Sequence, residues 1–260
     1  MGIFSNFVQY LPLYLLSLPV VLMALSIHEA AHGYAAYKLG DPTARNLGRI
    51  TLNPVKHLDV LGFLAMLVFH VGWAKPVPIN ARYFKNPRRD MAITGAAGPL
   101  SNLCLAIIHL LILRVSMIFV ADRFAGDVIA YATSYVTGSS YTGSLTFTLV
   151  SLVLYLLYLG VMLNVILTVF NLIPIPPFDG SRIFYAFLPP KLYFGVMKYE
   201  RIIMLVVLLL FVFGILTGPL TLLENAIING LFTITGMGKG SEEQAILSWM
   251  ITYVRDIVSL

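Results

Sequence analysis

Long apolar segments with few charged residues constrain the fold of this chain more than any other feature. They extend from about residue 11 to 38, 91 to 120, 141 to 170 and 202 to 223. At 1.5 Å per residue, a helix over any of them would cross the hydrocarbon core of a bilayer, which is about 30 Å thick. The chain is 58% hydrophobic and 11% charged, whereas roughly a quarter of the residues in a soluble domain are charged. We therefore predict an all-α polytopic membrane protein with about five or six transmembrane helices.

A shorter apolar run, from about residue 58 to 73, determines the expected topology. Its length is more typical of a re-entrant or interfacial segment than of a crossing. Basic residues lie on both sides of it, and basic loops favour the cytoplasmic side. They are Lys38, Arg45, Arg49 and Lys56 before the run, and Lys75, Arg82, Lys85, Arg88 and Arg89 after it. We therefore expect a re-entrant or short extended segment near residues 58–80, with segments 11–38 and 141–170 both running inward.

The first apolar segment contains the sequence His-Glu-Ala-Ala-His at residues 28–32. On a helix, His28 and His32 lie on one face, where their imidazoles can bind a zinc ion, and Glu29 lies beside them as a candidate general base. A carboxylate inside a membrane helix is energetically costly, so its presence indicates a functional site. The alternative is a buried polar cluster that only links helices. We predict that His28 and His32 bind Zn²⁺ and that Glu29 is catalytic.

The third metal ligand has to come from elsewhere, because a catalytic zinc usually has three protein ligands and one water. The candidate is Asp179, in the proline-rich stretch 171–180 that ends the apolar segment 141–170. Since segments 11–38 and 141–170 both run inward, Asp179 should lie near the same membrane face as the histidines. Its position before Gly-Ser is also typical of a helix N-cap. In combination with the histidine pair, the pattern favours a ligand.

Three further residues are candidates for contact with a substrate. Asn171 could donate a hydrogen bond to a substrate backbone or a developing oxyanion, or it could bond between helices. The same alternatives hold for Asn102, and for this residue we favour the structural role. In residues 74–80, prolines leave one edge of an extended segment without N–H donors. The N–H groups of the other edge, including that of Val77, are expected to be free. We hypothesise that this edge binds an unwound substrate, with a proline-stiffened loop as the alternative.

Three motifs in this order resemble the site-2 protease family of intramembrane zinc metalloproteases. They are His28-Glu-Ala-Ala-His32, Ala97-Gly-Pro-Leu-Ser-Asn102 and Asn171…Pro174…Asp179-Gly180. Residues 72–80 are similar to a segment of the small prokaryotic branch, which lacks the PDZ and CBS domains of some relatives. The resemblance covers about residues 20–190. It implies a three-helix catalytic core in which His28, His32 and Asp179 hold one zinc ion and Glu29 is the base.

The resemblance also implies an activity, which is hydrolysis of peptide bonds in or near transmembrane segments of other membrane proteins. We expect a single membrane-embedded metalloprotease domain over residues 1–260, with a catalytic core at about 11–190 and C-terminal helices at about 200–260. The protein should be a multi-pass protein of a prokaryotic cell membrane with its active site toward the cytoplasm. The expected partners are the lipid bilayer and a membrane-protein substrate, not nucleic acid. The oligomeric state stays open.

Two other classes of protein are compatible with a metal site in a membrane chain. A transporter or channel with a metal-linked gate should have two related halves, and the sequence has no visible internal repeat. A catalytically silent scaffold would not need three metal ligands and a base, whereas candidates for all four are present. The residues therefore favour a hydrolase over both alternatives.

Overall fold

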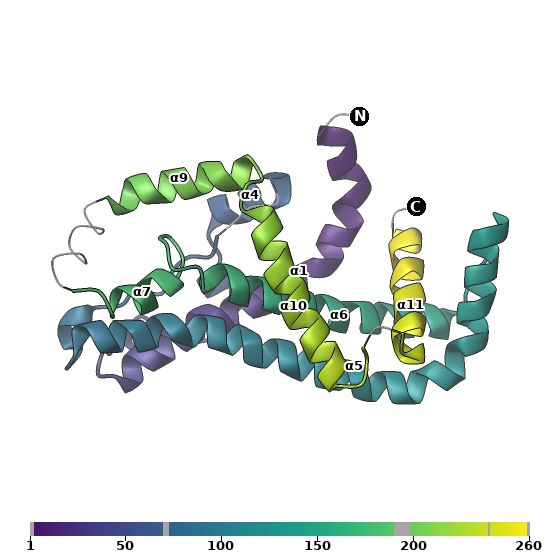
Figure 1. Cartoon of the computed structure of the whole chain (residues 1–260), viewed down its shortest axis with the longest axis horizontal. Coiled ribbons are helices and arrows are strands. Elements are labelled where there is room, and N and C mark those ends of the chain that lie inside the picture. Colours follow the sequence, from purple (N-terminus) through teal and green to yellow (C-terminus); the bar gives the residue numbers. More distant parts are fainter. Residues whose placement is uncertain (1–2, 70–72, 190–198, 239, 259–260) are drawn as a thin grey trace. The chain divides into compact units, whose positions relative to one another are not determined.

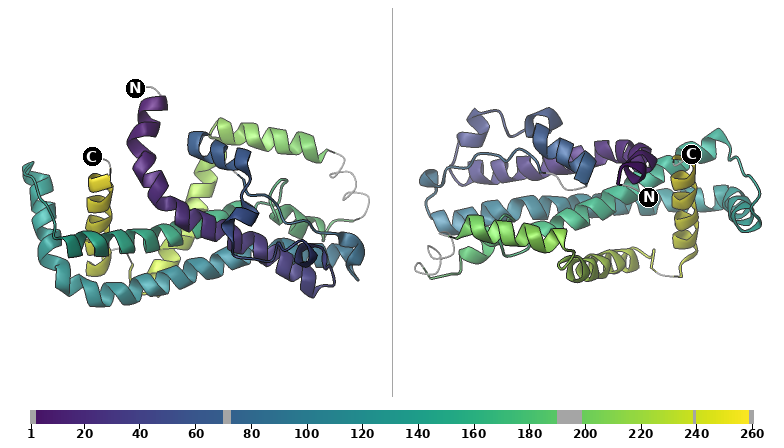
Figure 2. Two further views of the ribbon diagram at one scale, coloured as in Figure 1. Left: turned by 180° about the vertical axis from the view of Figure 1, so that it is seen from behind. Right: turned by 90° about the horizontal axis from the view of Figure 1, so that it is seen from above.

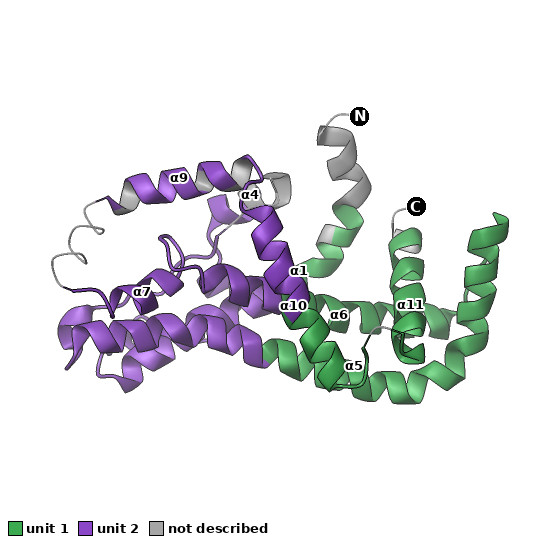
Figure 3. Ribbon diagram, viewed as in Figure 1, with its two compact units in different colours: residues 1–21, 105–163, 227–260 green, residues 22–104, 164–226 purple. Residues whose placement is uncertain are grey.

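The computed structural model describes residues 3–69, 73–189, 199–238 and 240–258, and these form helices and connecting loops (Figure 1). No β-strand occurs among them, and Leu58 and Ala74 form an isolated bridge. The predicted all-α class is confirmed. Contacts divide the chain into two compact units (Figure 3). Unit 1 contains residues 1–21, 105–163 and 227–260, and unit 2 contains residues 22–104 and 164–226.

Three of the described helices are long and apolar enough to cross a membrane. They are α1 (Ile3–Lys38) over its part from Leu11, α5 (Pro87–Thr137) and α6 (Leu145–Asn171). They correspond to the apolar segments expected at about residues 11–38, 91–120 and 141–170. The described helices therefore supply three candidate spans, whereas about five or six were expected.

The predicted crossing at residues 202–223 is wrong as a single helix. The structure instead has α9 (Glu200–Val212) and α10 (Thr217–Ile234). Gly214 between them has a φ of 71°, a left-handed conformation that glycine adopts without steric cost and that commonly ends a helix. The remaining C-terminal helix is α11 (Glu242–Val258).

Helix α5 is longer than its apolar segment predicted. It continues to Thr137, so the polar stretch around Asp122 and Asp127 is helical. At 1.5 Å per residue its 51 residues would extend about 77 Å if straight, more than twice the thickness of the hydrocarbon core. Figure 2 shows that the last turns of α5, within unit 1, bend away from the turns before them.

Unit 1 has its own hydrophobic core, in which α11 packs against parts of α5 and α6. The largest fully buried side chains of this core include Phe147, Leu110, Met117 and Met250. An ion pair between Arg114 Nη1 and Glu243 Oε1, 2.9 Å apart, joins α5 to α11. Because α11 buries one face in this core, it is a packing helix.

Unit 2 contains the segment near residues 58–80 that we expected to be re-entrant or short and extended. Short helices α2 (Thr43–Asn46) and α3 (Pro54–His57) precede α4 (Val60–Phe69), and the chain then returns. Leu58 pairs with Ala74, and the N–H of Lys75 donates to the carbonyl of His57 at 2.8 Å. The two ends of the segment therefore lie side by side, as a segment that enters and leaves by one face requires. Residues 70–72 lie outside the described part of the chain.

Candidate metal centre

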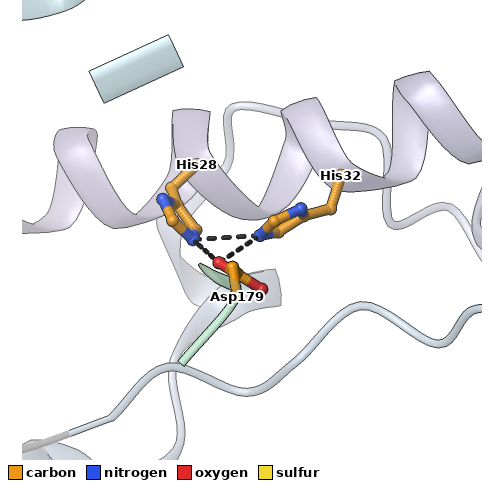
Figure 4. Close-up of side chains that lie close together, drawn as sticks. All are labelled: His28, His32 and Asp179. Carbon is orange, nitrogen blue, oxygen red and sulfur yellow. Dashed lines mark hydrogen bonds and ion pairs between the residues drawn. The ribbon is translucent and has the colours of Figure 1, made fainter. Parts of the chain in front are cut away.

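Two histidines of α1 and one aspartate that follows α6 converge in unit 2 (Figure 4). The Nε2 atoms of His28 and His32 are 3.0 Å apart, and they lie 3.1 and 3.0 Å from Oδ2 of Asp179. Zinc binds such atoms at about 2.0–2.1 Å, which places the ligands of a tetrahedral site about 3.3 Å apart. The three ligand atoms thus form a triangle of nearly the size that a zinc ion needs, and both histidines are buried.

The loop between α6 and α7 (Gly180–Tyr185) carries Asp179 to the histidines. Gly180 makes this approach possible, because a Cβ at this position would lie 2.3 Å from the carbonyl oxygen of Leu172. Asp179 does occupy the N-cap position of α7, but its side chain makes no capping hydrogen bond. Its carboxylate contacts the histidines instead, as expected of a ligand.

The charge of Asp179 also suits a metal ligand. Burial alone would raise the pKa of its carboxyl, but the hydrogen bonds and charge interactions with His28 and His32 outweigh burial and hold the pKa well below its usual range. The group is therefore ionised at neutral pH. A carboxylate is the form that binds a divalent cation.

Hydrogen bonds on the outer side of each imidazole fix its tautomer. Nδ1 of His28 lies 2.5 Å from Oδ1 of Asn102, and Nδ1 of His32 lies 2.7 Å from the carbonyl oxygen of Thr94. A carbonyl oxygen can only accept, so both Nδ1 atoms carry the proton and donate it. With Nδ1 as the donor on the outer side, Nε2 is the ring nitrogen that can give its lone pair to a metal ion in place of its contact with Asp179, which is the arrangement that zinc-binding histidines require.

The first turns of α5 supply these acceptors because α5 approaches α1 closely. A Cβ on Gly98 would lie 2.4 Å from Nε2 of His32 and 2.6 Å from Cε1 of His28. No side chain fits there without displacing the imidazoles. Gly98 therefore lets α5 approach the two candidate metal ligands of α1 directly.

Asn102 is fully buried and joins three helices. Its Oδ1 faces His28 on α1, and its Nδ2 donates to Oδ1 of Asn164 on α6 at 2.8 Å. Sequence reasoning missed Asn164, although an asparagine inside an apolar span is a signal of a polar contact. It also missed Thr94, which accepts through its backbone carbonyl. Every residue has this group, so no residue type in the sequence indicates such a contact.

Asn171 lies at the end of α6, where Nδ2 donates to the carbonyl of Leu167 at 2.9 Å. This bond lies within its own helix, so the described contacts do not bring Asn171 to the candidate metal ligands. Its role toward a substrate stays a prediction.

The extended segment at residues 74–80 differs from its prediction. The N–H of Val77 donates to Oε2 of Glu29 at 2.8 Å, and the N–H of Lys75 donates to His57. The expectation that these N–H groups remain free is therefore wrong. The edge of the segment that carries them faces the rest of unit 2, and one of its donors contacts the candidate base.

Removal of the Asn102 amide should weaken zinc binding. In Asn102→Ala the N–H of His28 loses its acceptor, and loss of such an outer contact lowers metal affinity roughly 10- to 100-fold. Competition with a chromophoric chelator measures the affinity. Asn171→Ala is the matched control, because its amide bonds only within its own helix in the described contacts. Equal affinities for Asn102→Ala and the parent would contradict the orienting role.

Comparison with known proteins is consistent with this geometry. A model described as "Peptidase family M50" matches residues 16–214. Two relatives are each named "Putative zinc metalloprotease". YwhC of Bacillus subtilis (strain 168) is 38% identical over 205 residues, which are 78% of this chain and 84% of that protein. Rip2 of Mycolicibacterium smegmatis (strain ATCC 700084 / mc(2)155) is 30% identical over 106 residues, which are 39% of this chain and 41% of that protein. No solved structure matches the chain.

Proposed function

Because this chain belongs to peptidase family M50 and is an integral-membrane zinc metalloprotease, we propose that it cleaves peptide bonds in or near transmembrane segments of other membrane proteins. The observation that carries this proposal is the depth of the metal centre. His28, Glu29 and His32 all lie within the apolar part of α1 that is long enough to cross a bilayer. A protease with its base and ligands on such a helix meets substrates that are themselves in the membrane.

We assign the ligand roles to His28, His32 and Asp179, and one zinc ion bound there would polarise the scissile carbonyl and lower the pKa of a bound water. Glu29 takes the proton from the water and later donates it to the leaving amine. Asn102 and the Thr94 carbonyl keep the two imidazoles in the ligating tautomer. Asn171 is the candidate for a hydrogen bond to the substrate.

The active site is proposed to face the cytoplasmic side of a prokaryotic cell membrane. His32 lies about 9 Å along the helix axis from the end of α1 at Lys38. The loops that follow, and those beyond the re-entrant segment, carry the basic residues that favour the cytoplasm. We therefore place the metal centre within the membrane, close to the membrane face at which the basic loops lie.

Cleavage of a mixture of membrane proteins tests the proposed function even while the natural substrate is unidentified. The purified protein is reconstituted into liposomes with several single-span membrane proteins, and new N-termini are identified by mass spectrometry. We expect new termini within or next to transmembrane segments, and we expect them to disappear when a chelator removes the metal and to return with zinc. New termini confined to soluble domains, or unaffected by the chelator, would contradict the proposal.

A further inference from the structure

A backbone amide of the extended segment 74–80 holds the carboxylate of Glu29. The N–H of Val77 donates to Oε2 of Glu29 at 2.8 Å, across 48 positions of the sequence. Val77 is buried, with 7% of its surface exposed. The donor end of the bond is therefore sheltered from water, whereas the Glu29 side is half-buried.

The sequence around Val77 suits it to this single bond. Pro76 and Pro78 have no N–H, so Val77 is the one backbone donor in the stretch 76–78. A residue that precedes proline favours an extended backbone, and Val77 precedes Pro78. The two prolines thus stiffen the stretch and leave no neighbouring donor to compete for Glu29.

Contacts on both sides of Val77 fix the segment on unit 2. At its start, Nη2 of Arg49 donates to the carbonyl of Lys75 at 2.7 Å. At its end, the N–H of Asn80 donates to Oδ2 of Asp41 at 2.7 Å. In the middle, the Val77 side chain packs against Gly33, where a Cβ would lie 3.2 Å from Cγ1 of Val77. Gly33 is one helical turn after Glu29, so the segment docks on α1 where the base projects.

We propose that the Val77 amide is a positioning donor that holds Glu29 as the general base, an inference that rests on the proposed function. A carboxylate has two oxygens that can accept hydrogen bonds. With Oε2 held by Val77, the orientation of the carboxylate is fixed, and Oε1 is the oxygen that takes the proton from water. The competing interpretation is that the segment obstructs the base and inhibits the enzyme.

Replacement of one amide by an ester separates these interpretations. Val77→α-hydroxyvaline, introduced by nonsense suppression, removes the N–H and keeps the side chain. We expect kcat to fall roughly 10- to 100-fold, the factor typical of a lost hydrogen bond to a charged group, whereas KM and the bound zinc stay at parental levels. Asn80→α-hydroxyasparagine is the matched control, since it removes the equivalent bond to Asp41, and its loss of kcat should be much smaller. A parental or increased kcat at position 77, or equal losses in both variants, would overturn the proposal.

Hydrogen exchange tests the contact independently of cleavage. The stretch 76–79 contains two exchangeable amides, those of Val77 and Ile79. Glu29→Ala should accelerate exchange at Val77 about tenfold or more and leave Ile79 unchanged, because only Val77 loses its acceptor. Unchanged exchange at Val77 would overturn the inference even in an active enzyme. If the unmodified protein cleaves no substrate, that result counts against the proposed function. The exchange rates at Val77 would still decide whether its amide holds Glu29.

Discussion

Glu29→Gln should lose nearly all proteolysis while it still binds one zinc ion. The amide of glutamine cannot accept the proton from the attacking water, and loss of a general base typically costs 10²- to 10⁴-fold in rate. The three ligand atoms are unaffected, because Glu29 makes its described hydrogen bond to Val77 and not to the metal ligands. Cleavage rates in liposomes and metal analysis of the same preparation measure the two quantities together.

Glu224→Gln is the matched control for this variant. Glu224 is also a half-buried helical glutamate of unit 2, on α10, and no described hydrogen bond joins it to the metal centre. It should retain parental cleavage. Parental activity in Glu29→Gln would show that another group takes the proton, whereas loss of zinc in that variant would place Glu29 among the ligands.

Asp179→Ser should abolish zinc binding and activity without unfolding the protein. Serine is a good N-cap residue but a poor substitute for a carboxylate ligand, so this variant separates the two roles that the sequence left open. We expect zinc affinity to fall by more than about 100-fold, beyond the loss expected from an outer contact such as Asn102. The thermal unfolding temperatures of the metal-free Asp179→Ser and Asp179→Ala variants should be similar, since the Asp179 side chain makes no capping bond that serine would preserve.

The comparison with Asp179→Ala completes this test. If Asp179 serves the metal, alanine and serine should be equally defective in zinc binding. If it serves only as a helix cap, serine should behave like the parent and alanine should lose about 1 kcal/mol of stability. A serine variant with parental zinc affinity would therefore remove Asp179 from the ligand set.

The candidate ligands of α1 could be predicted because their geometry is local. The spacing of His28 and His32 places both imidazoles on one face of any helix, whatever surrounds it. Asp179 is 147 residues from His32, so its closeness to the histidines could be predicted only from the expected membrane topology. The basic loops around residues 58–73 supplied that topology, and the pairing of Leu58 with Ala74 agrees with it.

Other features depended on contacts that a sequence does not display. The acceptor of the Val77 amide is a side chain 48 positions away, so local patterns suggested a free edge. Helix α5 runs past its apolar segment because a helix can continue through polar residues wherever no breaker ends it. The break between α9 and α10 falls within an apolar run, where Gly214 and the pair Gly218-Pro219 were the local signals. The single domain expected over residues 1–260 stays a prediction.

X-ray absorption spectroscopy of the zinc-loaded protein tests the central claim most directly, since it counts the ligands of the ion without reference to a substrate. We predict four nitrogen or oxygen neighbours at about 2.0–2.1 Å, with the outer-shell scattering of two imidazoles in the parent and of one in His28→Ala. A spectrum with three imidazoles, with sulfur at about 2.3 Å, or with no change in His28→Ala would contradict a site built from His28, His32 and Asp179.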